Sequence, residues 1–404
     1  MSCFQLPTSP IEWIFYALSL LQVFRAVQLT QILWHERADF LQEPLTRRKA
    51  SLGEQAAFFL AIPPSVAVHE LFHAIFVWVF GGRVARCGYG FYWGFVQPDR
   101  NFPVLEQWIM FLAGTIGSLV FAFVLWLALR HHSSSALRFF AKRSLRTLLF
   151  YSLIFYPIFS AVSFIGDWRI IYDFSQTPLL SGVTLIIHGV SLGVFWYGQK
   201  QGWFEMRQAD SATELAQIRQ LEAAAAANPQ DMTAQLHYIR ALRQSGTDNQ
   251  AKLAAQKFIQ TYPNIGEGYV ELALVQLINQ SRVPRTALDN LRRALSLPIS
   301  HAEYVITAHL ILGQHDMQLE RPEEAMNHFS YAIDVAHKIP GEAQPKLLSL
   351  AQAYHLRATA YQWQQQKTLA LADIDQAIEL ARVCGRTDMM KHYQTYKQSL
   401  LSPR

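Results

Sequence analysis

The stretch VAVHELFHAIF, residues 66–76, decides how this chain is interpreted, because it places three ionisable side chains in an otherwise apolar run. On a helix, residues four apart lie one above the other, so His69 and His73 can present two imidazoles to one metal ion. Glu70 lies about 100° further round the helix, where it can reach a water molecule beside that ion. Ionisable side chains are costly in hydrocarbon and usually mark a functional site there. We therefore predict that His69 and His73 are metal ligands and not packing residues.

The same spacing indicates a chemistry. H-E-x-x-H on a helix is typical of metallopeptidases, in which the two histidines bind zinc and the glutamate is the general base. A catalytic zinc also needs a third protein ligand and an open position. Asp167 is the preferred third ligand, because it follows an apolar segment and lies beside a glycine at the expected helix boundary. The alternative for Asp167 is an interfacial carboxylate paired with Arg169. Other candidates in this half of the chain are Asp99, Glu106, His131, Asp173 and His188, although a packing role is favoured for the last.

Composition indicates a membrane protein with two or three domains. Of the 404 residues, 51% are hydrophobic and only 16% are charged, against about 25% charged in soluble proteins. The net charge of +5 is spread over short clusters beside apolar segments, which favours membrane orientation over nucleic acid binding. The cysteines, Cys3, Cys87 and Cys384, lie far apart and predict neither a disulfide framework nor a thiolate zinc site. Residues 1–10 contain no Lys or Arg, so we expect the first apolar segment to be retained and not cleaved.

Apolar runs predict four or five membrane spans. A span needs about 20 residues, and the runs that reach or approach this length cover residues 52–80, 107–129, 145–165 and 178–196. A fifth run, residues 11–33, contains Arg25 and either crosses the bilayer or lies on its surface. The spans predict an integral, multi-pass protein in contact with the lipid bilayer.

Local signals divide the first of these runs. Pro63-Pro64 predicts a break, so that the helix with the metal motif starts afresh there, and Gly81-Gly82 predicts its end. Residues 83–105 are rich in glycine and aromatic residues without a helical period. They predict a short hairpin or re-entrant segment, or else an ordinary loop in the aromatic belt.

Basic residues indicate the orientation of the spans. Residues 130–146, expected to be a connector, carry the strongest cluster of Lys and Arg, and residues 37–49 form a second polar connector. By the positive-inside rule both connectors are cytosolic, and the C-terminal half of the chain is then on the same side.

The second half predicts a helical repeat array. Pro229, Pro263 and Pro298 follow one another at intervals of 34 and 35 residues, and 34 residues is the tetratricopeptide period. Alanines recur seven apart in three predicted second helices, as Ala287 and Ala294, Ala325 and Ala332, and Ala370 and Ala377. Seven residues are two helical turns, so each pair lies on one face and allows neighbouring helices to approach closely. We predict about four repeats over residues 231–382 and a capping helix near residues 388–400.

Such arrays have no catalytic chemistry of their own and bind partner proteins or peptides on their concave face. The histidines of this half show no ligand spacing with nearby acids, so we interpret them as surface or packing residues: His237, His301, His309, His315, His328, His337, His355 and His392. The alternative to a repeat array is a generic helical bundle.

Three segments together resemble a known family. HELFHA with the FGGRV that follows it, residues 69–84, resembles the zinc helix of the site-2 proteases, which are intramembrane metalloproteases. AGTIGSL, residues 113–119, resembles the family's next span. GDWRI, residues 166–170, resembles the motif whose aspartate is the third zinc ligand. The resemblance covers about residues 52–175. It implies Zn²⁺ bound by His69, His73 and Asp167, with Glu70 as the catalytic base and membrane proteins or peptides as substrates.

The chain departs from the family pattern in four ways. Thr115 stands where proline is usual, Ser118 where asparagine is common, and Trp168 where a glycine follows the ligand. The Asn-Pro-rich stretch usual before that aspartate is missing, and Tyr156-Pro157 is its nearest approach. Ser118 or Thr115 can hold the substrate backbone, although packing between helices is the simpler interpretation of these small residues.

The expected fold class is therefore all-α, a polytopic transmembrane bundle followed by a tetratricopeptide-type solenoid. The expected domains are residues 1–51, an apolar segment and polar connector; 52–205, the metalloprotease-like domain; and 206–404, the repeat domain. The leading hypothesis is an intramembrane zinc metallopeptidase. The alternative is a catalytically inactive, membrane-anchored scaffold.

Overall fold

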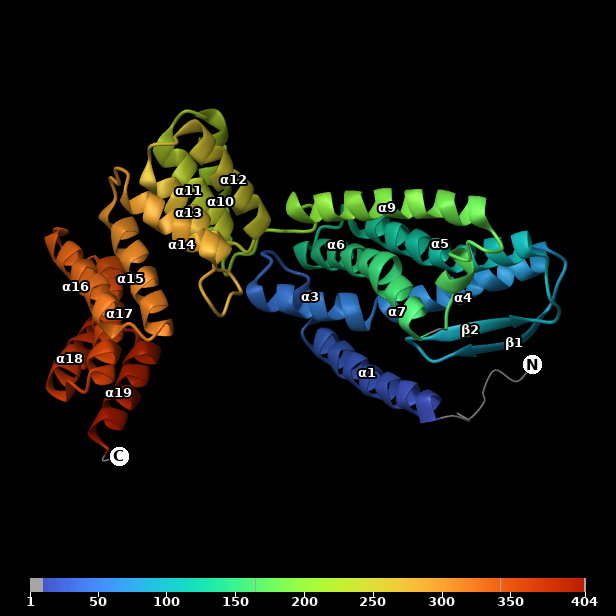
Figure 1. Cartoon of the computed structure of the whole chain (residues 1–404), viewed down its shortest axis with the longest axis horizontal. Coiled ribbons are helices and arrows are strands. Elements are labelled where there is room, and N and C mark those ends of the chain that lie inside the picture. The colour runs from blue at the N-terminus through green and yellow to red at the C-terminus, as the bar shows by residue number, and fades with distance from the viewer. Residues whose placement is uncertain (1–9, 164, 342, 403–404) are drawn as a thin grey trace. The chain divides into compact units, whose positions relative to one another are not determined.

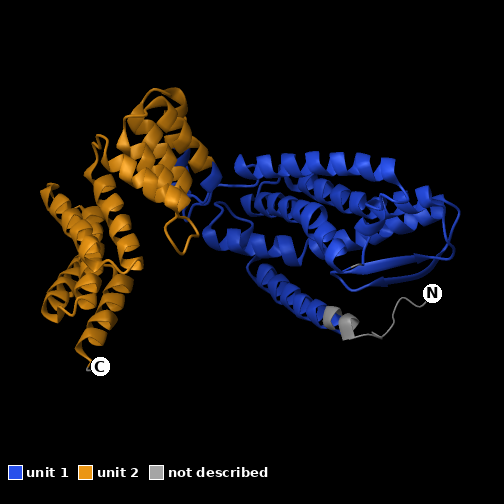
Figure 2. Cartoon of the chain, viewed as in Figure 1, with its two compact units in different colours: residues 1–220, 245–249 blue, residues 221–244, 250–404 orange. Residues whose placement is uncertain are grey.

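The computed structural model describes residues 10–163, 165–341 and 343–402, and it is almost entirely helical (Figure 1). The all-α fold class is therefore confirmed. Two compact units divide the chain: residues 1–220 with 245–249, and residues 221–244 with 250–404 (Figure 2). The expectations for residues 1–9, including Cys3, lie outside the described part of the chain.

The first unit holds the predicted spans. Its elements are α1 (Pro10–His35), α2 (Arg37–Phe40), α3 (Arg47–Phe59), α4 (Ile62–Val79), β1 (Val84–Tyr89), β2 (Gly94–Pro98), α5 (Val104–Leu129), α6 (Ser135–Phe150), the π-helical turn η1 (Tyr151–Phe155), α7 (Tyr156–Ser163), α8 (Trp168–Ile171) and α9 (Pro178–Lys200). Among the described residues, four helical stretches are long and apolar enough to cross a membrane: Arg47–Val79, Val104–Leu129, Ser135–Ser163 and Pro178–Lys200. Each overlaps one of the four predicted apolar runs, although the third begins at Ser135 and not near residue 145. α1 is not among them.

The two prolines break the first apolar run as predicted. α3 ends at Phe59 and α4 begins at Ile62, with the prolines in its first turn. Proline has no N–H, so Pro63 cannot bond to the carbonyl of Phe59, four residues earlier. The hydroxyl of Tyr92 donates to that carbonyl instead, at 2.9 Å. α4 ends before Gly81, whose φ of +74° is the left-handed conformation that glycine adopts readily.

Residues 84–98 form the predicted hairpin. β1 and β2 pair antiparallel and lie beside α4 (Figure 1). Tyr89 and Tyr92 attach the hairpin to the break between α3 and α4, through hydroxyl donors to the carbonyls of Pro63 and Phe59. The hairpin is thus held at the start of the helix that carries the metal motif.

The interpretation of residues 130–146 as a connector is wrong. Most of this segment is α6, which continues through η1 and α7 as one helical stretch. Its basic side chains lie on a helix that also buries Ala136, Phe139, Ala141 and Leu145. Lys and Arg are good helix formers, and an amphipathic helix can carry them on one face, so a cluster of basic residues did not require an irregular loop.

The second unit is a solenoid of antiparallel helix pairs. Its elements are the end of α10 (Ala212–Ala227), α11 (Met232–Gln244), α12 (Asp248–Thr261), α13 (Gly266–Gln276), α14 (Arg285–Leu295), α15 (Ala302–Gln318), α16 (Pro322–Lys338), α17 (Gln344–Trp363), α18 (Lys367–Val383) and α19 (Thr387–Leu401). α11 to α18 form four consecutive pairs over the predicted range, and α19 follows where the capping helix was expected.

The alanines spaced seven apart are buried as predicted. All six are fully inaccessible to solvent, on α14, α16 and α18, the second helices of successive pairs. Small side chains allow neighbouring backbones to approach, and larger residues such as Leu291, Phe329 and Ile374 fill the remaining core.

Candidate metal centre

Three buried side chains converge in the first unit, and they are the three predicted metal ligands. One ligand atom from each of His69, His73 and Asp167 lies within 4.8 Å of the other two, and no other such group of three occurs in the described part of the chain. Oδ2 of Asp167 is 2.8 Å from Nε2 of His69 and 3.1 Å from Nε2 of His73. The three residues are only 6–9% exposed, so water contributes little to solvating them.

Contacts from α5 orient both imidazoles. Nδ1 of His73 donates to the backbone carbonyl of Met110 at 2.7 Å, and Nδ1 of His69 lies 3.3 Å from Oγ of Ser118. A carbonyl only accepts, so Nδ1 of His73 carries the proton and the neutral ring keeps its lone pair on Nε2. Partners of this kind fix the tautomer and the direction of a metal-binding histidine. Ser118 thus contacts a predicted ligand.

α8 positions the third residue. Asp167 immediately precedes α8, where its carbonyl accepts the N–H groups of Ile170 and Ile171. The indole of Trp108 on α5 donates to the carbonyl of Ile171 at 3.2 Å. Gly166 has a φ of +119°, a conformation that side chains larger than hydrogen disfavour. The glycine beside the aspartate therefore allows the turn that brings the carboxylate to the histidines.

The chemistry of these donors fits a zinc ion. Two imidazole lone pairs and one carboxylate oxygen face one another, and a divalent cation satisfies all three at once. The backbone of α5 comes close to the donors at Gly114. A Cβ atom built on Gly114 would be 2.4 Å from Nε2 of His73 and 2.6 Å from Nε2 of His69. Any other residue at this position would occupy the space between the donors.

Glu70 lies next to this group with a free acceptor. Its Oε2 is buried and has no hydrogen-bond partner among the described residues. β2 passes beside it, and a Cβ on Gly94 would lie 2.6 Å from Cγ of Glu70. An unpaired buried carboxylate oxygen is costly, which is expected of a group that exchanges protons with a bound molecule.

The other candidate ligands lie elsewhere. Asp99 is exposed and accepts the N–H of Arg83, Asp173 accepts the N–H and hydroxyl of Ser175, and His131 is exposed. Glu106 lies in the first turn of α5. His188 accepts the hydroxyl of Tyr172 on Nδ1 at 2.5 Å and donates from Nε2 to the carbonyl of Leu153 at 2.7 Å, so both of its nitrogens are occupied.

Sequence analysis missed two contributors to this site. Gly114 was noted only within a motif, although small residues at AGTIGS signal a close helix approach. Tyr156 was noted only within Tyr156-Pro157, the nearest counterpart of the family's Asn-Pro-rich stretch. Its hydroxyl accepts the N–H of Asp167 at 3.3 Å, and its ring lies edge-on to His69 with centroids 5.6 Å apart. A single tyrosine in an apolar span carries no comparable signal.

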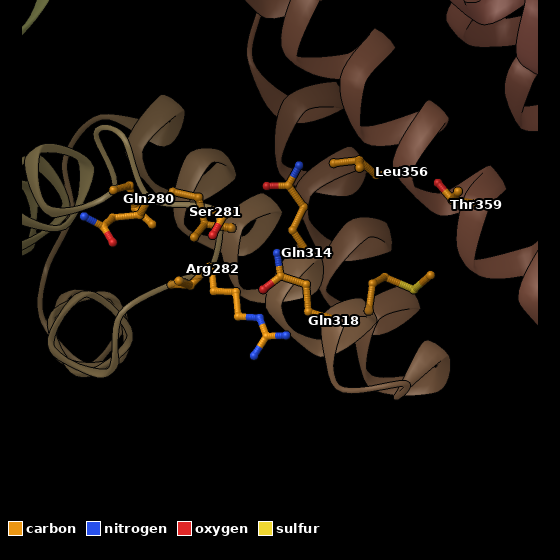
Figure 3. Close-up of a pocket in the computed structure, with 11 residues that line it drawn as sticks. Gln280, Ser281, Arg282, Gln314, Gln318, Leu356 and Thr359 are labelled. Carbon is orange, nitrogen blue, oxygen red and sulfur yellow. The ribbon is translucent and has the colours of Figure 1, made fainter. Parts of the chain in front are cut away.

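A hollow of about 430 Å³ lies in the second unit. It is lined by residues from α15, from α17 and from the segment that follows α13. α13, α15 and α17 are the first helices of three consecutive pairs. Figure 3 shows the side chains of Gln314 and Gln318 on α15 between those of Gln280–Arg282 and those of Leu356 and Thr359. Amide groups above an apolar floor can hydrogen-bond a peptide backbone.

Two histidine pairs also lie within this unit. Nδ1 of His309 is 2.9 Å from Nδ1 of His328, and the rings of His355 and His392 meet edge-on at 5.3 Å. Burial, with a smaller contribution from the neighbouring His328, lowers the pKa of His309 to about 4. Burial and His392 together lower the pKa of His355 to about 4. Both rings are therefore neutral near pH 7.

Comparison with known proteins adds little to this geometry. No protein-family model matches the chain, and no curated protein matches it in sequence. Two crystal structures of MamA are similar to part of it, each 19% identical over 42% of this chain. The two matches cover 89% and 84% of the MamA chains, with TM-scores of 0.31 and 0.30. Similarity at this level supports no argument about function, which therefore has to be argued from the residues themselves.

Proposed function

We propose that this protein is a membrane-embedded zinc metallopeptidase of the site-2 protease type, with a tetratricopeptide-like array that binds a protein partner or substrate. One observation carries the proposal. His69, His73 and Asp167 present their ligand atoms to one another inside a unit built from helices of membrane-spanning length, with Glu70 beside them. A histidine pair, a carboxylate ligand and a neighbouring glutamate base are the parts of a hydrolytic zinc site.

The reaction is the hydrolysis of a peptide bond. When bound, Zn²⁺ supplies a Lewis acid that lowers the pKa of water to about 7 and polarises a carbonyl. Glu70 takes a proton from the attacking water as the oxygen of that water bonds to the carbonyl carbon. Glu70 then delivers this proton to the nitrogen as the C–N bond breaks. The products are an amine and a carboxylic acid, which keeps the second proton of the water and releases it to solvent near pH 7. Met110 and Ser118 keep the two imidazoles directed at the metal throughout.

The array has a different role. Its helix pairs bury their alanines and leucines in the stack, so the surface of the first helices is available for a partner. We propose that the hollow bounded by Gln280, Gln314 and Thr359 takes part in holding an extended segment of a protein partner or substrate. We infer that the array lies on the cytosolic side of the membrane, because the basic residues of 37–49 and of 130–146 favour that orientation.

Metal content tests the proposal most directly. Detergent-purified wild-type protein is expected to hold about one zinc per chain, and His73→Ala and Asp167→Ala are expected to lose it. Asp173→Asn is the matched control, because its carboxylate accepts hydrogen bonds from Ser175 and Gln176 in its own turn. Glu70→Gln is expected to keep zinc and to lose cleavage of unstructured fluorogenic peptides. A wild-type protein without zinc would refute the proposal and favour the inactive scaffold. Wild-type protein that holds zinc but cleaves none of the peptides would also favour the inactive scaffold.

A further inference from the structure

An irregular turn directs Tyr156 at the metal site. η1 is a π-helical turn between α6 and α7, in which the backbone accommodates one extra residue. One extra residue turns the following helix by about 100°. Such turns occur often at functional sites, because they re-aim the side chains that follow. Tyr156 is the first residue after the turn.

The surroundings of Tyr156 hold its hydroxyl beside the third ligand. The oxygen accepts the N–H of Asp167 at 3.3 Å. The ring meets His69 edge-on, with an interplanar angle of 77°. The backbone of Gly166 covers the ring so closely that a Cβ there would lie 3.3 Å from Cε2 of Tyr156. The tyrosine is therefore packed between the two predicted ligands His69 and Asp167, with little freedom to move away.

We propose that the Tyr156 hydroxyl donates a hydrogen bond to the carbonyl oxygen of a bound peptide, where negative charge develops during hydrolysis. The inference rests on the proposed hydrolytic function. The hydroxyl accepts the backbone N–H of Asp167 and also bonds to the carboxylate of that residue, so its proton stays with the carboxylate until a substrate carbonyl takes its place. A placed donor stabilises a developing oxyanion more than it stabilises the neutral carbonyl of the substrate.

Other hydroxyls near the site are less suited to this task. Ser118 lies against Nδ1 of His69, on the side of the ring away from Asp167. Thr115 has a buried hydroxyl without a hydrogen-bond partner among the described residues. It lies on α5, next to Gly114, where no contact ties its oxygen to a ligand residue. Tyr156 is the hydroxyl whose position is set by a contact with Asp167.

The experiment compares Tyr156→Phe with Tyr151→Phe in the full-length, detergent-purified protein. Tyr151 is the matched control, because it belongs to η1 and stacks on Phe155, away from the ligands. Two probes are titrated, a peptide and the phosphinic peptide of the same sequence, whose tetrahedral anion resembles the transition state. The peptide is titrated in the Glu70→Gln background, so that it is bound and not cleaved. Zinc content and melting temperature are measured for each variant.

The expected result is selective. Tyr156→Phe weakens phosphinic peptide binding about 10²-fold and lowers kcat by a similar factor, while peptide binding, KM and zinc content stay unchanged. Tyr151→Phe changes none of these. Wild-type affinity of Tyr156→Phe for the phosphinic peptide, or an equal loss for both probes, would overturn the inference. A loss of zinc in Tyr156→Phe would also overturn it, in favour of a role in placing Asp167. Wild-type protein that holds no zinc would instead refute the proposed function itself.

Discussion

Gly114→Ala is expected to weaken zinc binding strongly although it adds only one methyl group. The new Cβ would lie 2.4 Å from Nε2 and 2.5 Å from Cε1 of His73, and 2.6 Å from Nε2 of His69. Carbon atoms and their non-bonded neighbours prefer separations of about 3.5–4.0 Å. The rings or the helices must therefore move apart by roughly 1 Å to accept the methyl group.

A displacement of this size is large for a metal site. Ligand distances in such sites hold to about ±0.2 Å, and disturbing even the outer contacts of a ligand costs about 10–100-fold in affinity. We expect zinc affinity to fall by at least about 10²-fold. The cost to folding is smaller, because overpacking of a core typically costs about 1–3 kcal/mol, and alanine favours a helix by about 1 kcal/mol over glycine.

Two other glycines provide matched controls. A Cβ on Gly117, about one turn along α5, would meet the ring of Phe72 at 2.7 Å, and its three nearest atoms all belong to Phe72. Gly117→Ala is thus expected to strain the same helix interface while keeping zinc. A Cβ on Gly189 in α9 would have no atom within 4 Å, so Gly189→Ala is expected to be neutral or stabilising. Competition with a zinc chelator measures affinity, and thermal melting separates it from folding. Wild-type zinc affinity in Gly114→Ala would refute this reasoning.

Three further predictions concern stability. Asp373→Asn is expected to destabilise the array by about 1.5–3 kcal/mol, measured by urea unfolding, because Asp373 is buried and the partly buried guanidinium of Arg357 loses its doubly hydrogen-bonded counter-ion. An effect below about 1 kcal/mol would contradict this. Folding lowers the pKa values of His309 and His355 from 6.5 to about 4, so the folded protein favours the neutral rings and the unfolded chain binds protons more readily. This stability is present above pH 6.5 and is lost as the pH falls towards 4, by roughly 1–2 kcal/mol for each partly exposed ring. Replacing both with glutamine should flatten the pH profile of unfolding. His188→Leu is expected to lower the melting temperature and to leave zinc content unchanged, whereas loss of zinc would return His188 to the set of ligand candidates.

The elements with strong local signals could be predicted from the sequence. Pro63-Pro64 placed the start of α4 to within two residues, because proline cannot continue the hydrogen-bond pattern of a helix. The solenoid could be predicted because prolines recur at the tetratricopeptide period and because alanines seven apart lie on one helix face, where they allow close packing of helices. The basic segment of α6 was misassigned because charge alone does not distinguish a loop from one face of a helix.

The candidate site could be predicted only in part. His69 and His73 are four residues apart, so one helix is enough to bring them together. Asp167 lies 98 residues from His69, and its choice depended on the neighbouring glycine and on a family resemblance. The roles of Gly114 and Tyr156 depend on how α4 packs on α5 and on the register of a π-helical turn. Neither of these is set by the residues nearest in the chain, because both arise from packing between elements.

The hydrogen bond from the hydroxyl of Tyr92 to the carbonyl of Phe59 has an evolutionary consequence. The carbonyl is available because Pro63 brings no N–H to it. A mutation of Pro63 to a residue with an amide would let the backbone reclaim the carbonyl and leave the tyrosine hydroxyl without its acceptor. A mutation of Tyr92 alone would leave the carbonyl unsatisfied. Descendants of this chain are therefore expected to exchange the two residues together, so that the proline and the tyrosine are inherited as a correlated pair.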